Sequence, residues 1–140
     1  MPAPPSWEHF AHDADIGIVA TGPTRVEAFR QAALALTAVI TNPTDVRTRD
    51  AVPIECDAPA DDLLLVDWLN ALVYEMATRN MLFGDFDGES ADGTLRATAW
   101  GERVDVARHE PAVEVKGATL TALAVTHDDD GWRVQCVVDV

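Results

Sequence analysis

PADDLLLVDWLNALVYEMATRN, residues 59–80, has the strongest helix pattern of the chain. Its apolar residues recur at steps of three and four, which predicts an amphipathic helix with one continuous apolar stripe packed against a core. Asp61 and Asp62 fall in the first turn, where the helix dipole favours acidic side chains. The stripe consists of Leu64, Leu65, Trp68, Leu69, Leu72 and Met76.

The same helix carries a polar flank. Asp67, Asn70 and Tyr74 are spaced three and four residues apart, so they face the same way. Most amphipathic helices carry such a face toward water. We therefore expect all three side chains to be solvated.

A second helix precedes this one. Thr24 is followed three residues later by Glu27, which is the pattern of a capping box. Asn42 and Pro43 mark the expected end of the helix. Its apolar positions, at helical spacing, are Val26, Phe29, Ala33, Leu36 and Ile40.

The rest of the chain has the pattern of strands. Alternation around Val52, Ile54 and Cys56 predicts a half-buried strand, in which Pro53 favours an edge position. Two helices and these strands predict one α+β domain, in which the two helices cover a mainly antiparallel or mixed sheet. The other expected strands are residues 15–21, 81–86, 94–104, 113–125 and 132–140, with turns at 87–93 and 127–131.

The charge of the chain restricts its partners. It has 24 acidic and 10 basic residues, for a formal charge of −14. Nucleic-acid-binding proteins usually carry a basic surface that neutralises phosphates, and the sequence has no cluster of Lys and Arg. General binding of bare RNA or DNA is therefore not expected. The acidity suits a divalent cation or a basic protein partner, or is simply a solubilising surface.

Cellular location follows from the cysteines and the N-terminus. Cys56 and Cys136 lie far apart without zinc-ligand spacing, which indicates small core residues in a reducing compartment. MPAPPSWEHF at the start has neither a cationic segment nor an apolar one, and no stretch of the chain is long enough to span a membrane. We expect a cytoplasmic protein that makes no membrane contact.

Acidic residues stand at both ends of the sequence. Asp15 opens the first strand after His12 and Asp13, and Asp139 lies near the end of the last strand, one residue before the expected terminal carboxylate of Val140. If these two strands are neighbours, three anionic groups converge. Such a group requires a cation, and ligation by oxygen alone selects a hard ion such as Ca²⁺, Mg²⁺ or Mn²⁺. The alternative is that both aspartates are solvated strand ends.

Four segments together carry a family resemblance. They are WEHFAHDADIG at 7–17, LLVDWLNALVYE at 64–75, ARHEPAVEVKGATLTAL at 107–123 and GWRVQCVVDV at 131–140. In order and spacing they resemble the successive motifs of the archease family across nearly the whole chain. The resemblance implies a small protein cofactor, without turnover of its own, of the RtcB-type RNA ligase. That ligase seals RNA ends in tRNA splicing and RNA repair with GTP and Mn²⁺.

The resemblance also implies roles for particular residues. The family's metal ligands fall on Asp15, Asp139 and the final residue Val140, and a functionally required lysine falls on Lys116. His12 and His109 belong to the matching motifs and are candidates for hydrogen bonds to the ligands or to a phosphate. Without the resemblance, both are ordinary partly buried histidines, and Lys116 is a surface side chain.

The sequence departs from the family pattern at two positions. Asp13 replaces the usual Thr and adds negative charge beside the expected ion. Asn42 replaces an Asp that commonly closes the first helix, and thereby removes a carboxylate.

Two functions from other classes remain open at this stage. A small divalent-metal-dependent hydrolase would use Asp15 and Asp139 to activate water, although the sequence has no Ser/His or Cys/His constellation beside them. A chaperone-like binding module would instead display an exposed apolar surface.

Overall fold

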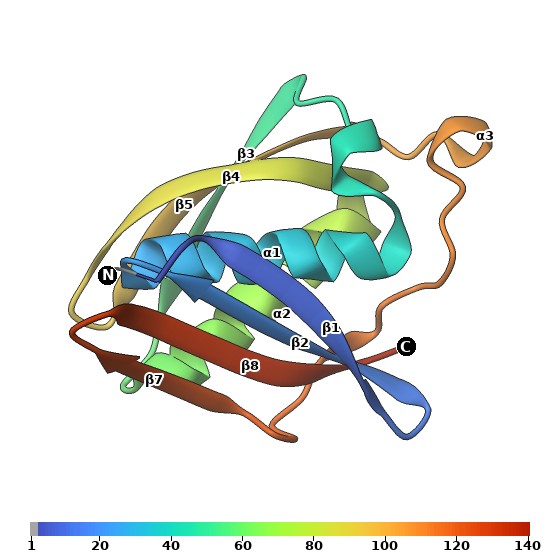
Figure 1. The fold of residues 1–140 in the computed structure, drawn as a ribbon. Coiled ribbons are helices and arrows are strands. Elements are labelled where there is room, and N and C mark those ends of the chain that lie inside the picture. The colour runs from blue at the N-terminus through green and yellow to red at the C-terminus, as the bar shows by residue number, and fades with distance from the viewer. Residues whose placement is uncertain (1–2) are drawn as a thin grey trace.

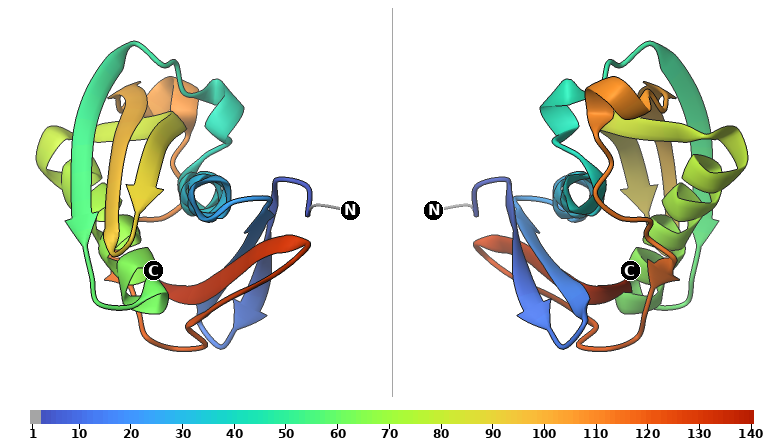
Figure 2. Two further views of the ribbon diagram at one scale, coloured as in Figure 1. Left: turned by 90° about the vertical axis from the view of Figure 1, so that its left-hand side faces the viewer. Right: turned by 90° about the vertical axis from the view of Figure 1, so that its right-hand side faces the viewer.

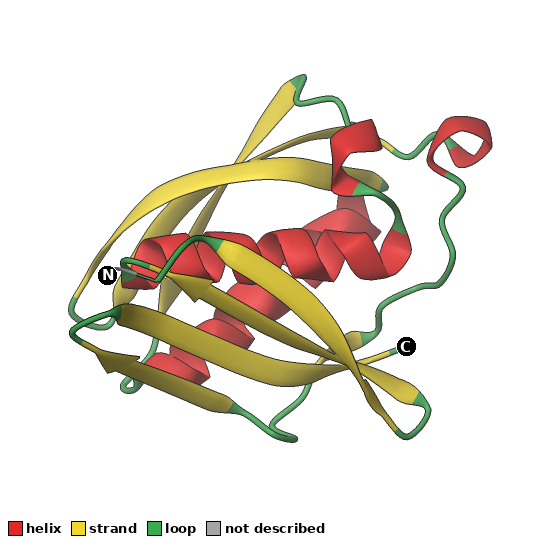
Figure 3. Ribbon diagram, in the orientation of Figure 1, coloured by secondary structure: helices red, strands yellow, loops and turns green. Residues whose placement is uncertain are grey.

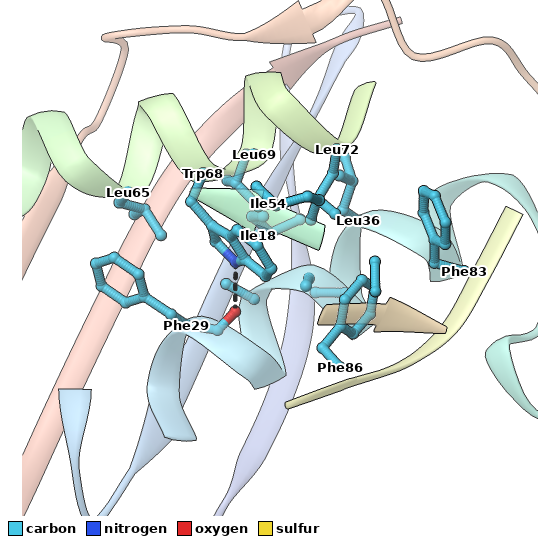
Figure 4. Close-up of a cluster of buried hydrophobic side chains, with 14 of the residues drawn as sticks. Ile18, Phe29, Leu36, Ile54, Leu65, Trp68, Leu69, Leu72, Phe83 and Phe86 are labelled. Carbon is cyan, nitrogen blue, oxygen red and sulfur yellow. Dashed lines mark hydrogen bonds between the residues drawn. The ribbon is translucent and has the colours of Figure 1, made fainter. Parts of the chain in front are cut away.

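The helix at residues 61–79 is the centre of the core, as its apolar stripe predicts. A computed structural model describes residues 3–140. Helix α2 (Asp61–Arg79) buries the six residues of the predicted stripe. The indole Nε1 of Trp68 donates a hydrogen bond of 3.0 Å to the carbonyl of Phe29 in helix α1 (Arg25–Ile40), so the buried ring also joins the two helices (Figure 4).

Helix α1 begins as its capping box predicts. Thr24 Oγ1 accepts a hydrogen bond of 3.2 Å from the Glu27 N–H. The helix ends at Ile40, and Asn42 then caps the short 3₁₀ helix η1 (Pro43–Asp45), where its Oδ1 accepts from the N–H and the hydroxyl of Thr44. Asn42 is therefore used in a local cap.

The strands form two antiparallel sheets with α1 and α2 between them (Figures 1 and 2). One sheet has the order β1-β2-β8-β6, with β7 also paired to β8, and the other has the order β3-β5-β4. The strands of the first sheet are β1 (Ser6–His12), β2 (Asp15–Gly22), β6 (Gly117–Ala118), β7 (Ala124–Asp128) and β8 (Gly131–Asp139). Those of the second are β3 (Asp50–Asp57), β4 (Met81–Ala91) and β5 (Thr94–Arg103), and a short helix α3 (Val106–His109) follows β5.

The α+β class is confirmed, but the expected single sheet is two sheets. The reason lies in α1, which is buried on most of its circumference, including at Ala28, Ala32, Ala35 and Val39. A helix that is apolar on most sides needs covering on more than one side. The two sheets supply that cover.

Two strand boundaries differ from the prediction, and strand β1, before the first expected strand, was not predicted. Strand β4 continues through the expected turn to Ala91 because its polar residues pair with β5, as in Glu89 opposite Arg96. The expected strand at 113–125 is interrupted between β6 and β7, where Ala122 adopts a positive φ of 53° (Figure 3). Pro53 does lie on an edge strand, as expected, because β3 pairs only with β5.

The sequence predicts that both cysteines are core residues and that no segment spans a membrane. Cys56 and Cys136 are buried and unpaired. Burial raises the pKa of the Cys56 thiol to about 11 and that of Cys136 to about 12, so both remain protonated core residues. Within residues 3–140, no helix has the length and apolar character needed to cross a bilayer. Met1 and Pro2 of the expected leaderless N-terminus lie outside the described residues.

Candidate functional site

The segment HDAD, residues 12–15, forms the tip of the β1–β2 hairpin. His12 pairs with Asp15, so Asp13 and Ala14 form the turn between the strands. Asp13 adopts a positive φ of 52°, a conformation that Asp tolerates better than most residues. Its side chain is 94% exposed and lies 3.9 Å from Nδ1 of His12. The motif therefore combines one solvated turn residue with two residues fixed on strands.

Strand β8 brings the C-terminal end of the chain to this hairpin. Ile16 of β2 pairs with Val138 of β8, and one further step of this register sets Asp15 opposite Asp139. The Val140 N–H donates a hydrogen bond of 3.3 Å to Oδ1 of Asp15. The sequence analysis left open whether these two strands are neighbours, and the register shows that they are.

The two aspartates share the outer face of this sheet. Successive side chains of a strand point to opposite faces of the sheet. Ile18 in β2, and Cys136 and Val138 in β8, are buried in the core, and each is an odd number of positions from the aspartate of its strand. Asp15 and Asp139 therefore point to the opposite side. Asp15 and Asp139, being half-buried, stay accessible at the sheet margin. His12, as the cross-strand partner of Asp15, belongs to the same row.

Lys116 lies just before β6, on the other side of β8 from Asp15. Gly117 pairs with Asp139, and the Lys116 N–H donates a hydrogen bond of 2.8 Å to the Asp139 carbonyl. Lys116 is the only lysine in the sequence, and its side chain is exposed. Within residues 3–140 its ammonium makes no hydrogen bond or ion pair. Five of the six predicted site residues therefore meet at one end of the sheet: His12, Asp15, Lys116, Asp139 and Val140.

His109, the sixth, lies in a separate buried network. Its Nδ1 accepts a hydrogen bond of 2.9 Å from the Asp105 N–H, which places the ring proton on Nε2. Nε2 lies 3.0 Å from Oε2 of Glu102, and Arg108 Nη2 lies 2.6 Å from the same oxygen. These contacts tie α3 to β5, and none of them involves Asp15 or Asp139.

The Glu102 network is sensitive to acid. The hydrogen bond from Arg108, with smaller help from the Arg47 N–H and His109, lowers the pKa of Glu102 to about 2, although burial acts in the opposite direction. Because this pKa is lower than the ordinary value of 4.5, ionised Glu102 stabilises the fold above pH 4.5. That contribution is lost as the pH falls from 4.5 toward 2.

We expect Glu102→Gln to lower the free energy of unfolding at pH 7 by about 2 kcal/mol, the scale of a hydrogen bond to a charged group. The difference from the parent should shrink between pH 4.5 and pH 2, where the parent loses the same charge. Urea unfolding across this range measures it. Glu55→Gln is the control, because Glu55 is 58% exposed and 3.7 Å from Arg96, and it should change little. A pH-independent loss in Glu102→Gln would contradict the assignment.

Asn70 is a functional candidate that the sequence reading missed. Its Oδ1 accepts a hydrogen bond of 2.8 Å from the Ala118 N–H, and its Nδ2 is 3.5 Å from the Ala118 carbonyl. Asp67 and Tyr74 are exposed, as expected, but the expectation of a solvated Asn70 is wrong. The partner of Asn70 is 48 residues away, so no local pattern reveals it. The only signal in the sequence is an Asn in a helix whose flanking residues are mostly apolar.

The oxygen groups at the end of β8 define what this site can hold. Among residues 3–140, no three or more His, Cys, Asp or Glu side chains are arranged to bind a metal ion. Asp15 and Asp139 supply two carboxylates at the end of the paired strands β2 and β8. Asn42 makes its side-chain bonds to Thr44 and not to this row.

The chain matches known proteins over nearly its full length. The model of the archease protein family (MTH1598/TM1083) matches residues 7–140. The protein archease of Pyrococcus furiosus is 39% identical over 139 residues, which cover 96% of this chain and 98% of the relative. That of Methanosarcina barkeri is 34% identical, with 96% and 95% covered.

Solved structures show the same fold. The solution structure of protein 1598 of Methanobacterium thermoautotrophicum has a TM-score of 0.83 at 30% identity, over 96% of this chain and 99% of that one. A crystal structure described as an archease and possible chaperone from Thermotoga maritima has a TM-score of 0.58 at 13% identity, over 100% and 98%. With the family model and the relatives in agreement, this chain belongs to the archease family.

Proposed function

We propose that this chain is a metal-binding accessory protein that activates an RtcB-type RNA ligase and performs no turnover of its own. The ligase carries out the GTP-dependent guanylylation and RNA sealing of tRNA splicing and repair. The accessory protein presents a cation and the ammonium of Lys116 to the ligase, and so promotes its repeated turnover. The resemblance of the motifs supplies the partner, and the membership in the archease family supports it.

The observation that carries the proposal is the convergence at the end of β8. The Val140 N–H contacts Asp15, and the Lys116 N–H contacts the Asp139 carbonyl, so one strand end holds residues from three separate parts of the sequence. Two carboxylates and an ammonium that has no ion-pair partner within residues 3–140 therefore lie at one end of the sheet. This arrangement suits recognition of a phosphate or an acidic group through a cation and a lysine together.

The residues present fit a hard divalent ion. Asp15 and Asp139 are half-buried and supply carboxylate oxygens, the ligands that hard cations prefer, and His12 of the same row adds one imidazole nitrogen. The hydrogen bond from Val140 uses Oδ1 of Asp15 and holds that carboxylate toward β8. Asp15, Asp139 and the carboxyl group of Val140 would therefore hold Ca²⁺, Mg²⁺ or Mn²⁺. The bound ion would supply a positive centre for phosphate oxygens.

A ligase assay tests the proposal. The purified chain should increase the number of RNA-sealing turnovers per ligase in the presence of GTP and Mn²⁺, and it should seal no RNA without the ligase. Because of its charge of −14, it should also show no appreciable affinity for tRNA near physiological salt. Product per ligase and a filter-binding titration measure the two expectations. A chain without effect on ligase turnover would contradict the cofactor role.

The two other functions predict different results in the same assays. A metal-dependent hydrolase would consume a phosphate ester without the ligase, in proportion to added metal. A chaperone-like module would protect unrelated unfolding proteins from aggregation, with or without metal and with or without Lys116.

A further inference from the structure

The side-chain amide of Asn70 pairs with the backbone of β6. The Ala118 N–H donates to Oδ1 at 2.8 Å, and Nδ2 lies 3.5 Å from the Ala118 carbonyl. The backbone N–H and the backbone carbonyl of Ala118 therefore both contact the Asn70 side chain. An edge strand leaves such groups without a sheet partner. Asn70 supplies that partner from helix α2.

The backbone at Gly117 accommodates this contact closely. A Cβ atom added to Gly117 would lie 3.2 Å from Oδ1 of Asn70, which is tighter than most side-chain contacts. The strand thus lies between β8 on one side and Asn70 on the other. Both neighbours bond within two residues of Lys116.

The segment that leads into β6 has few other anchors. Between α3 and β6, residues 110–116 form neither helix nor strand. Their backbone is held by the Glu110 N–H on the Val106 carbonyl, the Ala112 N–H on the Ile40 carbonyl and the Lys116 N–H on the Asp139 carbonyl, and the Val115 side chain is buried in the core. The two-residue strand β6 is held on β8 by the bonds of Lys116 and Thr119, and on the side of α2 by the bonds of Asn70 to Ala118.

We propose that Asn70 is a positioning residue for Lys116. By fixing Ala118 against α2, it holds β6 on β8, and it thereby sets the distance of the lysine ammonium from the carboxylates of Asp15 and Asp139. The inference rests on the proposed function of Lys116 in ligase activation. It adds a role for a helix that contributes no ligand to the site.

Two substitutions at this position separate the hydrogen bonds from packing. Asn70→Leu keeps the branched shape at Cγ, in a larger and apolar side chain, but makes neither bond to Ala118. Asn70→Asp keeps the oxygen that accepts the stronger bond of 2.8 Å. Asp67→Leu is the matched control, because Asp67 lies on the same polar flank, is exposed and makes no side-chain hydrogen bond within residues 3–140.

Amide hydrogen exchange followed by NMR gives a readout that needs no ligase. In Asn70→Leu, exchange at the Ala118 and Lys116 amides should accelerate by roughly tenfold, the factor that corresponds to one lost hydrogen bond. Stimulation of the ligase should fall toward that of Lys116→Ala. Asn70→Asp should restore both, and Asp67→Leu should change neither. Urea unfolding of each variant establishes that it is folded.

Several results would overturn the inference. Full stimulation by Asn70→Leu despite faster exchange would do so, and so would protection of Ala118 by Asn70→Asp without restored stimulation. In either case the parent would still stimulate and Lys116→Ala would not, so the proposed function would stand while the role of Asn70 would fall. If the parent itself gave no stimulation, the proposed function and the inference would fall together.

Discussion

Asp15→Asn and Asp139→Asn should each lower the affinity for a divalent cation by at least about tenfold and abolish stimulation of the ligase. Each change replaces a charged oxygen ligand by a neutral amide of the same shape. In Asp15→Asn, the amide oxygen can still accept the hydrogen bond that the Val140 N–H donates at 3.3 Å. A lower metal affinity of this variant therefore reports the missing charge and not a missing structural contact.

Stability without metal should respond in the opposite direction. The carboxylates of Asp15 and Asp139 lie on one face at the end of neighbouring strands, where like charges repel. Removing one charge should leave the midpoint of thermal unfolding of the metal-free protein unchanged or higher. A clear fall of that midpoint would instead identify the aspartates as structural residues.

Asp13→Asn is a close control for these variants. It removes the same charge from the same hairpin, but the Asp13 side chain is 94% exposed at the turn. Calorimetric titrations with Ca²⁺ and Mn²⁺ should show little change in this variant. Equal losses in Asp13→Asn and Asp15→Asn would mean that net charge alone, and not ligation, governs binding.

A chain extended beyond Val140 separates the main-chain carboxyl from the side chains. In the chain that ends at Val140, the carboxyl group is ionised at neutral pH, since its ordinary pKa is roughly 3.3 to 3.7. An added peptide makes it a neutral carbonyl and should weaken metal binding. An affinity equal to that of the parent would leave Asp15 and Asp139 as the only anionic ligands.

The elements that could be predicted are those whose signal is local. The stripe of α2 and the cap at Thr24 depend on spacings within a single helix, and both were predicted correctly. The meeting of Asp15 with the end of β8 followed from strand alternation together with one assumption about pairing, which the register confirms. The continuation of β4 to Ala91 and the split into two sheets depend on pairing between distant residues and were missed.

The same division applies to the site. Asp15, Lys116 and Asp139 could be named from motifs, because their residue types and order are visible in the sequence. Asn70 could not, because an amide on a polar flank has the same pattern whether it faces water or a strand 48 residues away. His109 was a candidate for the row of carboxylates by motif alone. Its partner Glu102, on β5, places it elsewhere.

Lys116→Ala should separate metal binding from ligase activation. Because Lys116 lies just before β6, near the carboxylates, and its ammonium has no ion-pair partner within residues 3–140, its removal should leave cation affinity unchanged or slightly higher. Stimulation should nevertheless fall by at least about tenfold, the loss expected when a charged contact to a partner disappears. Calorimetry and the ligase assay on the same sample measure both.

Two further variants show whether the charge or the shape of Lys116 matters. Lys116→Arg keeps the charge but replaces a compact ammonium by a planar guanidinium, and it should restore stimulation only in part. Arg133→Ala removes an exposed cation from the neighbouring strand β8, six residues before Asp139, and serves as the charge control. If Arg133→Ala lowered stimulation as much as Lys116→Ala, a general attraction to an acidic partner surface would explain the effect. A loss confined to Lys116, with metal affinity intact, would place this ammonium in direct contact with the ligase or its bound phosphate.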